Sequence, residues 1–140
     1  MLSLSQTTGY AILALTCMAR RRGEYVLAQD IARETGIHKP YLSKMLYGLA
    51  GKGLIQSKRG FKGGMSLSRG PREISLLEII RAVEGDKQDC RCMLGLPTCS
   101  TEHPCAIHPF WIKERDRIEK RLAKTTLADV LLTVQGGWGL

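Results

Sequence analysis

The sequence lacks the side-chain patterns that commonly mark an enzyme, and it lacks any long apolar run. It has no Ser/His/Asp set, no phosphate-binding loop and no pair of carboxylates at catalytic spacing, so catalysis has no positive support. The longest apolar run, Tyr10 to Ala19, is too short to span a bilayer. Three arginines follow this run instead of preceding it, which is the wrong order for a secretory signal. We therefore expect a cytoplasmic protein with no membrane contact.

Acidic residues are absent before Glu24, and positive charge is concentrated in one half of the chain. The 140 residues carry a formal net charge of +8. Residues 1–72 hold 12 of the 21 Lys and Arg but only 3 of the 13 Asp and Glu, whereas residues 73–140 are nearly balanced. A one-sided positive potential suits a surface that binds a polyanion, because neutralising phosphates releases their counterions. The alternative on composition alone is a generally basic, soluble protein.

The chain has five cysteines, and four of them lie within 16 residues. Cys17 stands apart in the apolar run and is expected to be a small buried side chain. The clustered four occupy a stretch with two prolines and little apolar periodicity; they are Cys90, Cys92, Cys99 and Cys105. In a chain without a secretory signal, such clustering favours a metal or redox site over structural disulfides.

The first half of the chain is typical of a helix-turn-helix. Apolar residues at helical spacing predict helices over 7–22, 28–35 and about 39–50, with Gly36 making the left-handed turn before the third. The buried face of the third helix is expected to consist of Leu42, Met45, Leu46 and Leu49. Two short helices joined through a glycine also occur in bundles that do not bind DNA, so this pattern is weak by itself.

A basic hairpin follows the third helix. Residues 54–58 and 65–69 read as two strands, and the segment between them is rich in glycine. The hairpin has no acidic residue, and its glycines allow the backbone to approach another surface closely. A basic hairpin directly after a helix-turn-helix predicts a wing.

The second half is predicted to be helical on both sides of the cysteine stretch. A capping box at Ser75 and Glu78 opens one helix. Pro109 suits the first turn of a longer helix, and Thr126 opens a short final one. The longer helix carries a narrow apolar stripe of Trp111, Ile118 and Leu122. This stripe favours a seam between two subunits, with packing against the helix's own domain as the alternative.

Several motifs run through nearly the whole chain, from Leu4 to about Val134. They include Gly9-Tyr10-Ala11, Arg59-Gly60-x-x-Gly63-Gly64, Ala82-Val83-Glu84-Gly85 and Thr126-Leu127-Ala128-Asp129-Val130. With the spaced cysteines, these motifs make the chain resemble the IscR/NsrR/CymR family of bacterial winged-helix regulators. The resemblance implies a mostly α-helical fold with a small β-wing, in which a winged helix-turn-helix precedes a long C-terminal dimerisation helix. It also implies a DNA-binding transcription regulator, a repressor, and not an enzyme.

The resemblance divides the chain into four expected parts. They are a DNA-binding domain over 1–85, a cysteine-rich loop over 86–108, dimerisation helices over 109–134 and a flexible tail over 135–140. A homodimer would bind a pseudo-palindromic operator in double-stranded DNA, with each third helix in a major groove and each wing at a minor groove. The expected contacts lie off the buried helix face or on the wing: Lys39, Pro40, Tyr41, Ser43, Lys44, Tyr47, Lys52, Lys58, Arg59 and Lys62.

The resemblance further implies an iron–sulfur cluster in the loop, 2Fe–2S favoured over 4Fe–4S, sensing iron or cluster supply, redox state or nitric oxide. Its expected ligands are Cys92, Cys99, Cys105 and His108, since thiolates are the usual cluster ligands and some relatives place a histidine three residues after the last cysteine. Cys90 competes with Cys92 for the first position.

The fourth ligand has fewer candidates than in the relatives. Nitric-oxide-sensing relatives take a carboxylate from the start of the first helix, where this chain has Gly9, so that route is closed. His103 and Glu102 stand behind His108 as candidates. His108 is alternatively a residue resembling an N-cap before Pro109.

Other interpretations of the loop remain open on the sequence. The cysteines and a histidine suit structural zinc, although the usual Cys-x2–4-Cys pairs are missing. Bare thiols suit a disulfide switch, with Arg91 lowering a thiolate pKa. The chain would then be a cluster-free regulator controlled by thiols or by a protein partner. A small redox protein is a further alternative, but it leaves the basic half unexplained.

Overall fold

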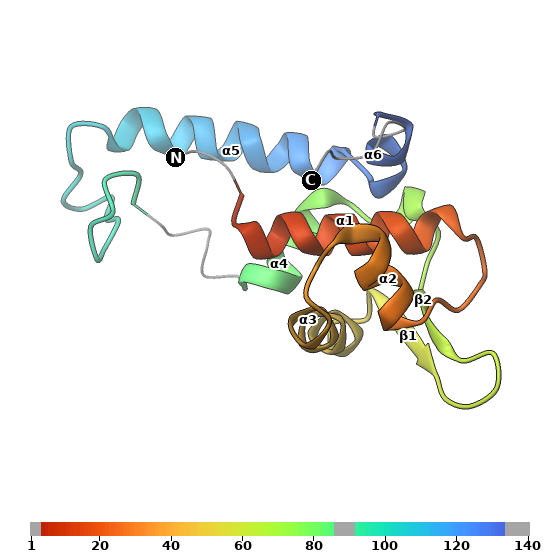
Figure 1. The fold of residues 1–140 in the computed structure, drawn as a ribbon. Helices are drawn as coiled ribbons and strands as arrows, with labels where there is room; N and C mark the ends of the chain where they lie inside the picture. The colour runs from red at the N-terminus through yellow and green to blue at the C-terminus, as the bar shows by residue number, and fades with distance from the viewer. Residues whose placement is uncertain (1–3, 86–91, 134–140) are drawn as a thin grey trace.

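The computed structural model describes residues 4–85 and 92–133. Within these residues, six α-helices, a short 3-10 helix and a two-stranded antiparallel sheet follow one another (Figure 1). Their bounds are α1 Gln6–Arg20, α2 Ala28–Thr35, α3 Lys39–Gly51, β1 Ile55–Lys58, β2 Gly64–Leu67, η1 Pro71–Glu73, α4 Leu76–Glu84, α5 His108–Lys124 and α6 Leu127–Thr133. The predicted fold class, mostly α-helical with a small β-wing, is confirmed.

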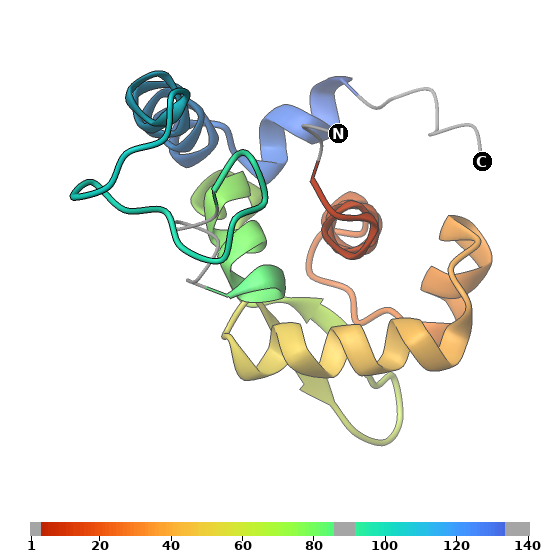
Figure 2. The same ribbon diagram turned by 90° about the vertical axis from the view of Figure 1, so that its left-hand side faces the viewer.

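Helix α1 forms the centre of the molecule. Seen end-on, it is surrounded by α2, α3, α4 and α6 (Figure 2). Nine of its 15 residues are buried, from Thr8 to Ala19. The helix expected over 7–22 is present, but it begins one residue earlier and ends two residues earlier, because the chain leaves the helix at Arg21. Its buried residues are not confined to one stripe, because several elements cover α1 at once.

The helix-turn-helix consists of α2 and α3. Gly36 adopts φ 72° after α2, and its N–H bonds to the carbonyl of Ala32, so the left-handed turn expected there is present. All four leucine and methionine residues predicted for the inner face of α3 are buried. Burying each such side chain stabilises the fold by about 1.5–3 kcal/mol, and this determines which face of α3 remains exposed to solvent.

The wing is formed by β1 and β2, with Ile55 opposite Leu67 and Lys58 opposite Gly64. Gly64 has φ 141°, and a Cβ there would stand 2.6 Å from the carbonyl oxygen of Val26. This close approach permits a β-bridge between Val26 and Met65, which ties the base of the wing to the segment before α2. Strand β2 is shorter than the predicted 65–69, because Arg69 turns away to pair with Glu78.

Helix α4 packs against α1 and α3, whereas α5 and α6 lie on the side of α1 away from the wing (Figure 1). Ser75 caps α4 by accepting from the Glu78 N–H, as the capping box predicted, but the Glu78 carboxylate binds Arg69. A bridge between Ser75 and Thr126 and the fully buried Leu127 fasten α6 to the core. Across the described ranges, no helix combines the length and apolar character needed to cross a membrane.

Candidate functional site

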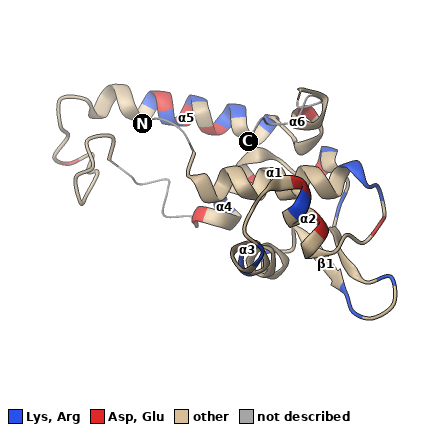
Figure 3. Ribbon diagram, viewed as in Figure 1, with Lys and Arg blue, Asp and Glu red and all other residues tan. Residues whose placement is uncertain are grey.

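The outer face of α3 and the wing hold all the residues predicted to contact DNA. Nine of these ten residues are exposed and Ser43 is half-buried, so none is part of the core. Lys and Arg gather on α3, on the turn of the wing and on the segment between α1 and α2, whereas α5 carries both signs (Figure 3). The folded chain therefore keeps a basic surface over the helix-turn-helix and the wing.

Tyr41 connects this surface to α1. Its hydroxyl lies 2.6 Å from the Thr7 hydroxyl, and its ring packs edge-on against Tyr10 with 6.0 Å between ring centroids. The alternative to a DNA contact for this tyrosine was partial packing against the wing, but its partners lie on α1. Tyr47 is 81% exposed and lies on the open face of α3.

The wing carries aromatic contacts that the sequence reasoning missed. The Lys58 ammonium lies 5.7 Å from the ring centroid of Tyr25, a cation–π contact that braces the base of the hairpin. Phe61, at the turn, is 88% exposed, and Lys62 lies over its ring at 5.6 Å. An aromatic residue inside a glycine-rich basic turn was the available signal for this position.

The cysteine segment lies at the opposite end of the molecule from the wing (Figure 1). Backbone N–H groups of Leu96 and Leu94 donate to the Cys92 sulfur and lower the pKa of its thiol. Cys92 also shares hydrogen bonds with the thiols of Cys105 and Cys99. Burial and the neighbouring Cys92 thiol raise the pKa of Cys99. Cys92 therefore lies close to both Cys99 and Cys105, and all three are free thiols.

His108 joins this group from the first turn of α5. Its side chain is only 7% exposed, and its Nδ1 lies 3.2 Å from the Cys99 sulfur. The other ring nitrogen, Nε2, is buried and has no hydrogen-bond partner among the described residues. The alternative role as an N-cap is wrong, because Ile107 is the cap residue and His108 already belongs to the helix.

The remaining candidates of the loop take no part in this contact. His103 and Glu102 are exposed, and their backbone N–H groups donate to the Ser100 hydroxyl. Cys90 and Arg91, like the predicted tail over 135–140, lie outside the described residues. Within residues 4–85 and 92–133, no three His, Cys, Asp or Glu side chains are arranged to hold a metal ion. The thiols thus meet through hydrogen bonds and do not surround a common point.

The apolar stripe predicted on α5 is incompletely covered by its own chain. Ile118 is 50% exposed, and Trp111 and Leu122 are half-buried. Helix α5 packs against α4, yet His108 is its only buried residue among those described. Phe110 and Leu132, which the sequence reasoning did not single out, are 53% and 71% exposed. The C-terminal helices therefore present apolar surface to solvent.

A comparison with protein families finds one match that covers almost the whole chain. The model of the Rrf2 family, described as iron-dependent transcriptional regulators, matches residues 4–133. This range includes α3, the wing, the cysteine segment and α5.

Individual relatives and solved structures agree with this match. The HTH-type transcriptional regulator IscR of Serratia proteamaculans is 32% identical over 124 residues, which are 87% of this chain and 74% of the relative. The structure of CymR, the global cysteine regulator of B. subtilis, superposes with a TM-score of 0.79 at 27% identity, covering 95% of this chain and 98% of CymR. The T. potens IscR structure gives a TM-score of 0.75 at 30% identity, over 99% and 94% of the two chains.

Proposed function

This chain belongs to the Rrf2 family of transcriptional regulators, and from that premise we propose that it is a homodimeric cytoplasmic repressor controlled by an iron–sulfur cluster. Members of the family bind DNA and are not enzymes. The observation that carries the proposal is the proximity of Cys92 to Cys99 and Cys105, together with the contact of Cys99 with His108 in the first turn of α5. Three thiolates and one imidazole form a ligand set suited to a 2Fe–2S cluster, and the neutral imidazole raises its potential.

The state of these side chains fits such a group. The three thiols are free and close together, so no disulfide competes for them. A buried imidazole nitrogen without a partner costs about 1–3 kcal/mol, and His108 Nε2 is such an atom. A binuclear cluster is larger than a single metal ion, and its thiolate ligands must lie around its core. The present contacts between the cysteine sulfurs would therefore separate when the cluster binds. When bound, the cluster supplies a charged redox centre between the loop and α5.

The four side chains connect two parts of the fold. Cys92 belongs to the segment that follows α4, whereas His108 belongs to α5. A cluster whose ligands come from this segment and from α5 would hold the winged helix-turn-helix and the proposed dimer helix in one relative position. Loss of any thiol releases this link, which changes the spacing of the two α3 helices in a dimer.

A second link runs from the end of α4 to α3. Glu84 accepts hydrogen bonds from the Ser5 N–H at 3.3 Å and from the Thr8 hydroxyl at 2.5 Å. Thr7, beside them, is bonded to Tyr41 of α3. We propose that a shift of the cysteine segment pulls on Glu84 and reaches the DNA-contacting helix through the first turn of α1.

DNA binding itself is proposed to use α3 in a major groove and the wing at a minor groove. In this proposal Lys44 and Ser43 contact base edges, whereas phosphates are contacted by Tyr41, Lys52 and Lys58. The exposed apolar face of α5 supports a homodimer, in which each subunit contributes one half-site.

The proposal is tested by purifying the protein without air and measuring its absorption spectrum and its iron-to-sulfide ratio. The variants Cys92→Ala, Cys99→Ala and Cys105→Ala are each expected to be colourless but folded, because two thiolates are too few to retain the cluster. His108→Ala should assemble a more labile cluster with a shifted spectrum. Cys17→Ala is the matched control and should remain coloured. Colour retained in all three cysteine variants, or zinc in place of iron in the wild type, would contradict the cluster.

A cluster-free regulator controlled by thiols is the second candidate, favoured by the direct hydrogen bonds among Cys92, Cys99 and Cys105. The structural similarity to CymR, the global cysteine regulator of B. subtilis, supports it as well. This candidate requires wild-type protein without iron or sulfide. Mild oxidation should then lower its mass by two hydrogens as a disulfide forms, and should change its affinity for DNA.

A further inference from the structure

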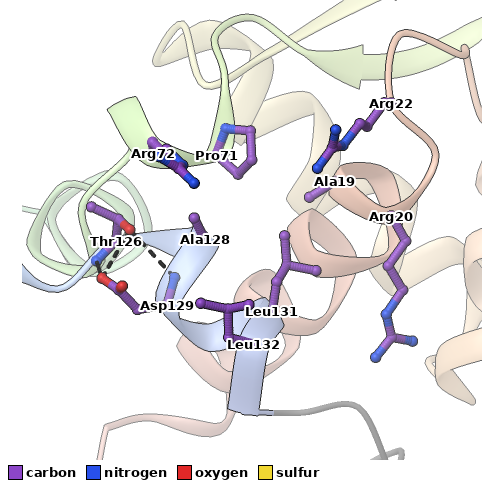
Figure 4. Close-up of a pocket in the computed structure, with 10 residues that line it drawn as sticks. All are labelled: Ala19, Arg20, Arg22, Pro71, Arg72, Thr126, Ala128, Asp129, Leu131 and Leu132. Carbon is purple, nitrogen blue, oxygen red and sulfur yellow. Dashed lines mark hydrogen bonds between the residues drawn. The ribbon is translucent and has the colours of Figure 1, made fainter.

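A cavity of about 600 Å³ lies where the end of α1, η1 and α6 meet (Figure 4). None of the residues that line it belongs to α3, to the wing or to the cysteine segment. Its volume is in the range of pockets that hold small ligands, roughly 300–1,000 Å³. The cavity is therefore separate from both the DNA surface and the proposed cluster site.

The lining is strongly positive. Arg20, Arg22 and Arg72 line the cavity together with a single carboxylate, that of Asp129, and the guanidinium groups of Arg22 and Arg72 lie nearest its centre (Figure 4). Arg22 and Arg72 come from different segments, the one after α1 and the other from η1 (Figure 4). Within the described parts of the chain, neither of these two side chains forms an ion pair or a hydrogen bond. Arg22 is therefore available to an anion, whereas Arg72 also lies in the electrostatic field of the Asp129 carboxylate and helps to lower its pKa.

The one carboxylate in the lining is already committed. Asp129 accepts hydrogen bonds from the Thr126 backbone N–H at 2.7 Å and from the Thr126 hydroxyl at 2.9 Å. These bonds hold the pKa of Asp129 below its usual value, so the carboxylate is ionised and turned onto the first turn of α6. It does not neutralise Arg22, which stands on the other side of the cavity (Figure 4).

The rest of the wall is apolar. Leu131 and Leu132 reach the cavity from α6, and Ala19 reaches it from α1. Leu132 is 71% exposed, so its side chain has little contact with the protein itself. An inorganic anion would satisfy the arginines but would leave these leucines in water. The lining matches a ligand that is anionic at one end and aliphatic at the other.

We propose that this cavity binds a small aliphatic monocarboxylate. The carboxylate would lie between Arg22 and Arg72, and the aliphatic chain would lie along Leu131 and Leu132. A ligand in this position contacts α1, η1 and α6 at once, and so stabilises the packing of α6 on the winged part of the fold. This gives the regulator an input that does not pass through the cysteines.

The test uses octanoate as the probe, with octan-1-ol and inorganic phosphate as matched probes that lack the charge or the aliphatic body. Calorimetry and thermal unfolding of the full chain should show binding of octanoate at submicellar concentration. Each charge-assisted hydrogen bond contributes about 1.5–3 kcal/mol, so octanol should bind at least about tenfold more weakly. Phosphate, without contacts to the leucines, should also bind at least about tenfold more weakly.

Substitutions test whether octanoate binds in this cavity or is attracted non-specifically to a basic protein. Arg22→Gln and Arg72→Gln should each weaken octanoate binding about tenfold, while Arg33→Gln, on the exposed face of α2, should leave it unchanged. Leu132→Asn should weaken octanoate but not phosphate. Without ligand, all four variants should unfold at the wild-type temperature, because these side chains are exposed. Equal binding of octanoate and octanol, equal binding of octanoate and phosphate, or full binding by the Arg22→Gln/Arg72→Gln double variant would overturn the proposal.

Discussion

Arg59 and Lys62 stand on either side of the exposed Phe61 in the turn of the wing. Arg59→Ala is expected to weaken operator binding by about 1–3 kcal/mol, because a guanidinium in a narrow minor groove reads the shape of the DNA. Lys62→Ala should weaken binding to all sequences alike and reduce the salt slope by about one. Fluorescence anisotropy over a salt series measures both effects. Lys113→Ala on α5 is the control, and unchanged affinity in both wing variants would remove the wing from the DNA interface.

Thr8 is fully buried, and its hydroxyl donates to the Glu84 carboxylate at 2.5 Å. Thr8→Val keeps the shape of the side chain but removes the donor to a charged group. The free energy of unfolding should fall by about 1–3 kcal/mol, as measured by urea denaturation. Thr98→Val, at an exposed position, should change it by less than about 0.5 kcal/mol. Equal stability of the two variants would show that water replaces the lost donor.

Helix α6 depends on the hydrogen bonds of Asp129 to Thr126, which lower the pKa of Asp129. A carboxyl whose pKa is lower in the folded state stabilises the fold above the pKa of the unfolded chain, about 3.9. That contribution is lost as the pH falls through the lower folded value. Asp129→Ala should therefore lower the melting temperature at pH 7, and the difference from wild type should shrink below about pH 4. Asp116→Ala, in an exposed pair with Lys120, is the control. A constant difference at all pH values would contradict this assignment.

Helices whose ends and buried faces depend on residues close in sequence were predictable. Gly36, the leucines of α3 and the capping pattern at Ser75 each act within one turn of chain, and the structure reproduces α2 and α3 closely. The environment of α1 was not predictable, because α4 and α6 cover it from positions far along the chain. Likewise the spacing of the cysteines indicated a common site, but only the folded chain places His108 inside α5 with a buried ring.

For the whole molecule, the exposed side of α5 is the main unsatisfied surface. Ile118 is 50% exposed, and His108 is the one described residue of α5 that is buried against its own chain. Ile118→Asp is expected to give monomers, because a charge cannot be buried unpaired in a subunit seam. Light scattering gives the mass, and a gel-shift assay should show weak DNA binding from single half-sites. Asp116→Lys, on the polar side of α5, should remain dimeric. A wild-type monomer at micromolar concentration with DNA present would contradict the homodimer.

The family resemblance noticed in the sequence is confirmed by the match over residues 4–133 and by the solved structures of IscR and CymR. That level of inference succeeded because the wing motif and the cysteine stretch occur together in the order of the fold. The order of motifs alone does not indicate which cofactor, if any, the cysteine segment binds. It depends on side-chain contacts around Cys92 and His108, which the spacing of residues does not determine.

The central position of α1 has a consequence for how the protein is made. Among the described helices, α1 is synthesised first, and α6, which closes one of its sides, is synthesised last. At about 5–20 residues per second, α1 waits for seconds before its final partner is synthesised. During that interval its uncovered face is a binding site for chaperones or for another nascent chain. The helix that organises the finished regulator thus spends part of synthesis with its apolar surface uncovered.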